Sequence, residues 1–366
     1  MMQSPEKQPK KKGKMWLNLA YIAAIAGVMA YLLLRDESLT NVAEAMRTLD
    51  SAWLALAVAC SLGFLLIEGW AMFFTIRWLC PGSRVGYFHA LRTALIGQFY
   101  SAITPSSTGG QPMQVLDMYQ QGLSVGHGTS VVMIRFVTHQ TAIFLFTFFG
   151  FVTQYSFIKS AMASFIPLGI LGIVLSMGCV ALVIAATVST HMTHALFSWL
   201  VRTLTRLHLC RNPEKLQNQL NDVLSDFHEA GAYLRSHIGH MFVLTAFDVL
   251  FYALLYSVTY CLYRAFGLHV HSYLKIVLLQ AFMWSTIYFF PLPGASGASE
   301  GGFLLLFRRV FTPKFVFSSM LLWRVLTYYN KIIVGAIGVV AGALEKSRHG
   351  ERPPEETEIS ESDAHA

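Results

Sequence analysis

The chain has 366 residues, of which 54% are hydrophobic and only 13% charged, and its mean hydropathy is +0.50. This composition excludes an ordinary soluble domain and predicts a polytopic membrane protein. The 27 Lys and Arg outnumber the 20 Asp and Glu, a balance that suits an anionic membrane surface, and no basic stripe interleaved with aromatic residues indicates nucleic-acid binding. The five cysteines form neither a zinc pattern nor an obvious disulfide set, and we expect no metal and no cofactor.

The N-terminal residues 1–14 are basic and precede an apolar run at 16–34. That run exceeds the 7–15 residues, roughly, of a signal-peptide hydrophobic region and ends at Arg35 without a small-residue cleavage site. It therefore predicts an uncleaved anchor whose basic end lies in the cytoplasm.

Further apolar runs follow at about 52–80, 87–103, 129–155, 164–189, 239–266, 273–290, 302–312 and 315–344, compared with the ~20 residues that cross a bilayer. If the first five runs all crossed, the basic linker 191–238 would lie outside, against the positive-inside tendency. We therefore predict that 87–127 and 272–312 enter the membrane and turn back. The fold class expected is all-α and polytopic, with about six crossings, two opposed re-entrant hairpins and both termini in the cytoplasm. One transmembrane domain would span 15–345, including 191–238 as a cytoplasmic amphipathic linker, and 346–366 is predicted to be a disordered acidic tail.

Both predicted hairpins are interrupted by Pro, Gly and small polar residues, at 103–113 and 290–302. Backbone groups released from helical bonding find no water in hydrocarbon, so such breaks survive only where protein or a wet cavity surrounds them. The similar spacing of the two breaks indicates an inverted repeat around a polar cavity. The residues expected to shape the breaks and the cavity are Thr104, Pro105, Gly109, Gly110, Gln111, Pro293, Gly294 and Gly297.

Arg135 and His139, four residues apart, share one face of an otherwise apolar run. Ionisable groups at membrane depth usually face a cavity or a partner. Arg135 is a candidate ligand for a lipid phosphate, because a guanidinium holds phosphate by two parallel hydrogen bonds. The alternative is an internal ion pair with one of four acidic residues: Glu68, Asp117, Asp248 or Glu300. A lone histidine such as His139 is more often structural.

In the last crossing, Arg324 and Tyr328 are predicted to face the interior, whereas Lys331 can extend to the interface. Asp248 is expected to be a counter-ion to one of the cations. Glu300 opens a helix after the second break, where a carboxylate would cap free amides; the alternative is a titratable group that contacts substrate in the cavity.

These motifs in this order resemble a known family. Thr104-Pro-Ser-Ser-Thr-Gly-Gly-Gln-Pro112, then Arg135, Pro291-Leu-Pro-Gly-Ala-Ser-Gly-Ala-Ser-Glu300 and Trp323-Arg324 with Thr327-Tyr328-Tyr329 are similar to the lysylphosphatidylglycerol synthase transmembrane region. This is the flippase-like domain of the bacterial multiple peptide resistance factor and its stand-alone relatives. The likeness extends from about residue 15 to 345. Ala295 and Ser101-Ala102 depart from the usual pattern, which affects the expected headgroup more than the fold.

The resemblance implies an integral protein of the cytoplasmic membrane that moves a phospholipid or related polar lipid between leaflets. We expect this chain to lack the soluble synthase domain, so that it is a transporter rather than an enzyme, with a separate cytoplasmic synthase as a candidate partner. Substrate would contact Arg135, His139, Asp248, Glu300, Arg324 and Tyr328. No Gly-x-x-x-x-Gly-Lys-Ser/Thr motif occurs, so movement would be downhill or coupled to an ion gradient. The alternative is a membrane-embedded glycosyl- or headgroup-transferase that acts on a lipid carrier.

Overall fold

The computed structural model describes residues 46–163, 166–188, 237–287 and 292–349. These residues form helices joined by short turns, and no β-strand occurs among them, which confirms the all-α class. The predicted N-terminal crossing, most of the 191–238 linker and the 346–366 tail beyond His349 lie outside the described residues.

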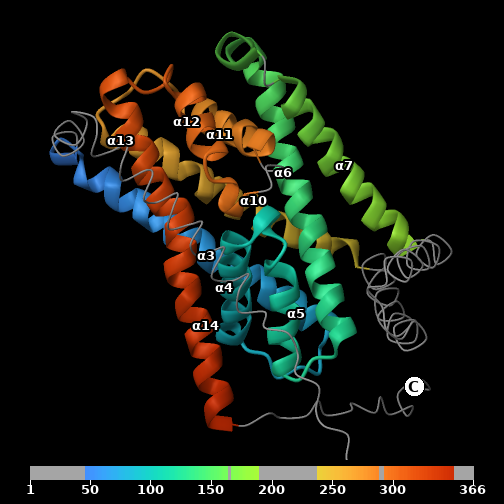
Figure 1. Ribbon diagram of the computed structural model, residues 1–366. Helices are drawn as coiled ribbons and strands as arrows, with labels where there is room; N and C mark the ends of the chain where they lie inside the picture. Colours follow the sequence, from blue (N-terminus) through green and yellow to red (C-terminus); the bar gives the residue numbers. More distant parts are fainter. Residues whose placement is uncertain (1–45, 164–165, 189–236, 288–291, 350–366) are drawn as a thin grey trace, which may run out of the picture.

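The helices fall into two runs along the chain (Figure 1). The first comprises α3 (Ser51–Leu79), α4 (Tyr87–Ile103), the 3-10 turn η1 (Pro105–Ser107), α5 (Gly110–Gln120), α6 (Val125–Met162) and α7 (Ile166–Val188). The second comprises α10 (Ile238–Ala265), α11 (Tyr273–Ile287), η3 (Pro293–Ala295), α12 (Ala298–Phe307), α13 (Pro313–Arg324), the π-helical turn η4 (Val325–Tyr329) and α14 (Asn330–His349).

Four helical stretches of the described residues are long and apolar enough to cross a membrane: Ser51–Leu79, Val125–Ser160, Ile238–Ala265 and Pro313–Glu345. They coincide with four of the six predicted crossings, and α7 coincides with a fifth. Both predicted hairpins are pairs of short helices joined by a break, α4–η1–α5 and α11–η3–α12. That these pairs enter the membrane and turn back stays a prediction.

The two breaks adopt the same backbone conformation. Thr104 (φ −110°, ψ 147°) matches Leu292 (φ −113°, ψ 146°), and Ser106 (φ 51°, ψ 24°) matches Gly294 (φ 58°, ψ 21°). The residue that follows has a positive φ in both breaks, 57° in the first and 48° in the second. Because residues other than glycine are uncommon in this region, two copies of the conformation indicate a common structural requirement.

The breaks are part of a longer internal repeat. Pro105 and Pro293, which begin the two 3-10 turns, are 188 residues apart. The same offset separates the first residues of α5 and α12, and the first residues of α6 and α13. Arg324 follows Arg135 by 189 residues, so each half carries an arginine at nearly the same place in the second helix after its break. The helix boundaries thus contain an internal repeat, and that its two copies are inverted in the membrane stays a prediction.

The two halves pack through α3 and α10, the pair of helices in most extensive contact. Phe64 and Leu65 of α3 meet Phe251, Leu255 and Tyr256 of α10 in a shared apolar cluster. A second cluster lies among α3, α4, α5 and α6, and a third joins α3 and α10 to α11, α12 and α13. The breaks η1 and η3 contact each other directly. The fold thus brings together two segments that are far apart in the sequence.

The last crossing is interrupted by the π-helical turn η4, which is tied to α3. Ser61 Oγ donates to the Leu326 carbonyl at 2.5 Å, and Asn330 Nδ2 donates to Ser61 O and Oγ at 3.0 and 2.7 Å. A π-turn inserts one residue and changes the local bonding pattern, and side chains from a neighbouring helix commonly satisfy the backbone groups that it frees. This anchoring fixes the position of Tyr328 beside the breaks.

Candidate functional site

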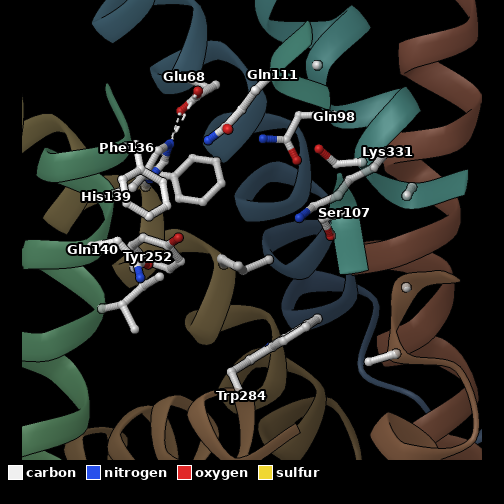
Figure 2. A pocket seen from close by; sticks show the side chains of 18 of the residues that line it. Glu68, Gln98, Ser107, Gln111, Phe136, His139, Gln140, Tyr252, Trp284 and Lys331 are labelled. Atoms are coloured by element: carbon white, nitrogen blue, oxygen red, sulfur yellow. Dashed lines mark hydrogen bonds and ion pairs between the residues drawn. The ribbon is translucent and has the colours of Figure 1, made fainter. Parts of the chain in front are cut away.

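A cavity of about 240 Å³ lies where the two halves meet. Side chains from both breaks and from α3, α4, α5, α6, α10, α11 and α14 line it. Figure 2 shows Glu68, Phe136 and His139 on one side, Gln98, Ser107 and Lys331 on the other, and Trp284 at one end. The cavity has both aromatic and hydrogen-bonding walls.

Arg135 lies at one edge of the cavity and pairs with two carboxylates. Its Nη2 atom is 2.9 Å from Glu68 Oε2 and 2.7 Å from Asp248 Oδ1, while Nη1 donates to Asp248 Oδ2 at 3.0 Å. Arg135 is 3% exposed, Glu68 3% and Asp248 0%. Arg135 therefore forms the internal ion pair that was the alternative to phosphate binding. Of the four acidic residues considered, Glu68 and Asp248 are its partners. Asp248 is a counter-ion, as the sequence predicted.

His139 completes this cluster. Its Nε2 atom lies 3.1 Å from Glu68 Oε2 and its Nδ1 atom 3.3 Å from Asp248 Oδ1. The ring also packs edge-on against Phe251 and Tyr252 of α10. His139 thus links three helices and presents its remaining surface to the cavity.

The oxygens and nitrogens of Glu68, His139 and Asp248 lie within 4.8 Å of one another, a spacing that suits a divalent cation. Arg135 donates to both of these carboxylates, and a cation at the same place would compete with that guanidinium. The arrangement is accounted for by ion pairing, and we assign no metal to it.

Arg324 forms the corresponding pair in the second half. Its Nε lies 2.7 Å from Glu300 Oε1, and its Nη2 donates to Ser296 Oγ at 3.1 Å. Glu300 Oε2 in turn accepts from the backbone N–H of Gly297 at 2.6 Å, at the start of α12. Glu300 therefore caps α12 and also neutralises Arg324. This arrangement agrees with the capping role considered from the sequence.

Tyr328 joins the two breaks. Its hydroxyl donates to the Ala102 carbonyl at 3.2 Å, just before the first break, and its ring packs on Gly294 of the second. The Arg324 guanidinium lies 4.2 Å from the ring centroid. The predicted inward orientation of Arg324 and Tyr328 agrees with the burial of both side chains.

The first break is held by Thr104, whose Oγ1 accepts from the Gly109 N–H at 2.9 Å and donates to the Tyr100 carbonyl at 2.6 Å. A Cβ on Gly109 would collide with Thr104, and one on Gly110 would collide with Ser101 and α4 backbone. The two glycines thus let α5 pack against α4. Pro105 begins the turn, and Gln111 lines the cavity.

Two cavity residues were not expected from the sequence. Lys331 was predicted to extend to the interface, but it lines the cavity, with Nζ 5.6 Å from the Phe64 ring centroid. Glu68, in the middle of α3, was considered only as an ion-pair partner. Four glutamines also line the cavity: Gln98, Gln111, Gln114 and Gln140. Gln111 was expected from the sequence, whereas the other three were not, and the signal that could have identified them is an amide inside or beside an apolar run.

A helical bundle with membrane-length helices around a partly polar internal cavity defines a polytopic membrane protein. The chain belongs to the family described as the lysylphosphatidylglycerol synthase TM region, whose family model matches residues 17–335. It is also similar to a UPF0104 membrane protein from Archaeoglobus fulgidus, at 25% identity over 300 residues that cover 78% of this chain and 86% of that protein. Family membership points to a membrane role connected with lipids.

Proposed function

We propose that this protein moves a phospholipid or related polar lipid between the leaflets of the cytoplasmic membrane, with the headgroup passing through the cavity at the two breaks. The observation that supports this most is the direct contact of η1 and η3 around a cavity with polar walls. A headgroup in hydrocarbon loses its hydrogen bonds with water, and a polar cavity replaces them. The acyl chains would stay in the surrounding lipid.

Lys331 is our candidate for holding the lipid phosphate. Arg135 and Arg324, the two earlier candidates, are each bonded to carboxylates. Within the described part of the chain, Lys331 forms no ion pair, and its side chain reaches the cavity opposite His139 (Figure 2). An ammonium group without a counter-ion in a partly enclosed site is stabilised by a bound anion. The arginines then position Tyr328, His139 and the break, rather than meeting the phosphate themselves.

Leaflet exchange of a fluorescent phosphatidylglycerol in proteoliposomes tests the proposal. We expect the full chain to accelerate exchange over protein-free vesicles, and Lys331→Gln to slow it about tenfold or more, because a hydrogen bond to a charged group contributes about 1.5–3 kcal/mol. Lys159→Gln is the matched control, since Lys159 is exposed near the end of α6 and does not line the cavity. It should stay within about twofold of the unmodified chain.

The same vesicles separate a translocase from a transferase. Lipids extracted after incubation with a lipid-linked donor are read by mass spectrometry, and exchange without a new headgroup is the result expected. Exchange no faster than in empty vesicles would overturn the proposal. A new headgroup formed on the lipid would instead favour the transferase.

A further inference from the structure

We propose that the cavity selects a lipid with an anionic phosphate and a neutral, hydroxyl-rich headgroup, and discriminates against headgroups that carry a positive charge. This inference rests on the proposed function, because it assigns the substrate class of the same cavity. It follows from which charges around the cavity are already neutralised, and from which hydrogen-bonding groups are not satisfied.

The acidic groups around the cavity are already paired. Glu68 and Asp248 share the guanidinium of Arg135. Glu300 is paired with Arg324 and caps α12. Among the described residues near the cavity, no carboxylate is therefore left for the ammonium group of an aminoacylated headgroup. Lys331 adds a positive charge that a phosphate would neutralise and a second ammonium would oppose.

The cavity instead offers amides that have no hydrogen-bond partner among the described residues. The side chains of its four glutamines make no hydrogen bond to the described residues, although Gln114 is only 9% and Gln140 only 6% exposed. Buried amides in native proteins are nearly always hydrogen-bonded, so a ligand or water is required here. An amide both donates and accepts, as does a hydroxyl, and a polyol headgroup satisfies both of its functions.

The remaining wall is aromatic. Trp284, Tyr252 and Phe136 line the cavity, and Trp284 Nε1 is buried with no partner among the described residues. Flat rings suit the C–H faces of a polyol. Rings also attract quaternary ammonium groups, so a choline headgroup is the competing occupant that the experiment must compare.

Equilibrium competition in detergent measures this selectivity without requiring transport. The full chain is loaded with fluorescent phosphatidylglycerol, which is displaced by phosphatidylinositol, phosphatidic acid, phosphatidylcholine or lysylphosphatidylglycerol. We expect phosphatidylinositol to compete at a concentration about tenfold lower than lysylphosphatidylglycerol or phosphatidylcholine. Water-soluble inositol phosphate, added alone, shows whether the headgroup binds without its chains. Equal competition by all lipids, or preference for either cationic group, would overturn the inference.

Two variants connect the selectivity to the residues. Gln140→Leu should weaken competition by phosphatidylinositol about tenfold while leaving phosphatidic acid unchanged, because only the hydroxyl-rich headgroup needs the amide. Gln154→Leu, on the same helix and away from the cavity, is the control. Thermal unfolding without lipid verifies that both variants fold, and a Gln140→Leu chain that folds and binds all lipids unchanged contradicts the inference. Selective binding without leaflet exchange would contradict the proposed transport alone, whereas exchange without headgroup preference would contradict this inference alone.

Discussion

Replacing Arg135 by methionine is expected to lower the free energy of unfolding by about 3–5 kcal/mol. The variant leaves Glu68 and Asp248 buried without their cation, and both are almost completely inaccessible. Removing one member of a buried ion pair has this effect because the remaining charge stays uncompensated in a low-dielectric surrounding. Thermal or denaturant unfolding of the purified protein in detergent is the measurement.

Two controls decide whether charge is the cause. The triple variant Glu68→Gln, Arg135→Met, Asp248→Asn removes all three charges and should recover most of the stability. Arg77→Met, on the exposed end of α3, should change stability by about 0.5 kcal/mol or less. If the triple variant is no more stable than Arg135→Met, lost packing rather than lost charge explains the effect. If Arg135→Met folds with unchanged stability and loses only lipid binding, then the phosphate-ligand alternative for Arg135 is correct.

The breaks and helix ends could be predicted because their signals are local. Proline lacks an N–H donor and glycine tolerates a positive φ, so Pro105 and Gly294 mark breaks in any surrounding structure. The crossings followed from hydropathy and from the charge of the loops. Ion-pair partners could not be predicted in the same way. Arg135 had four acidic candidates, and only tertiary packing selects Glu68 and Asp248.

The orientation of Lys331 illustrates what local patterns cannot supply. A uniform helix would put Lys331 on the same face as Arg324, seven residues earlier. The π-turn at Val325–Tyr329 inserts a residue, which rotates α14 by about 100° relative to an uninterrupted helix. Arg324 and Lys331 nevertheless both point into the protein, so the face count was not at fault; the prediction was wrong because it took a lysine near a helix end to extend to the interface. The turn depends on Ser61 of α3, which no pattern within the last crossing reveals.

The repeat gives the two halves the same framework but different chemistry. Arg135 and His139 in α6 correspond to Arg324 and Tyr328, each pair four residues apart and offset by 189. The first pair forms a charged cluster at the edge of the cavity, whereas the second holds the breaks together through Tyr328. The two halves thus share a framework but differ in chemistry at these positions, and among the described residues that line the cavity Lys331 is a cation without an ion-pair partner.

Alanine substitution at three glycines of the second hairpin is expected to produce a graded loss of stability. Gly294 has a φ of 58° and its Cβ would collide with the Tyr328 ring, so Gly294→Ala combines about 1–2 kcal/mol of backbone strain with about 1–3 kcal/mol of overpacking. Gly297, at φ 86° and ψ −54°, has open space around its Cβ, and Gly297→Ala should lose only the backbone strain of this sparsely populated region, about 1–3 kcal/mol. Gly301, inside α12 with nothing within 4 Å, should gain about 0.5–1 kcal/mol as alanine.

The three variants differ in cause: Gly294→Ala combines backbone strain with overpacking, Gly297→Ala has backbone strain alone, and Gly301→Ala has neither. Unfolding in detergent gives the stabilities, and leaflet exchange shows whether contact between the breaks matters for transport. Gly294→Ala moves the ring that joins the second break to Ala102, so it should slow exchange more than Gly297→Ala does at a temperature where both variants are folded. Equal stability of the Gly294 and Gly297 variants would show that the Tyr328 ring moves aside without lowering the free energy of unfolding. In that case the packing of Tyr328 on Gly294 would not be what holds the two breaks in register.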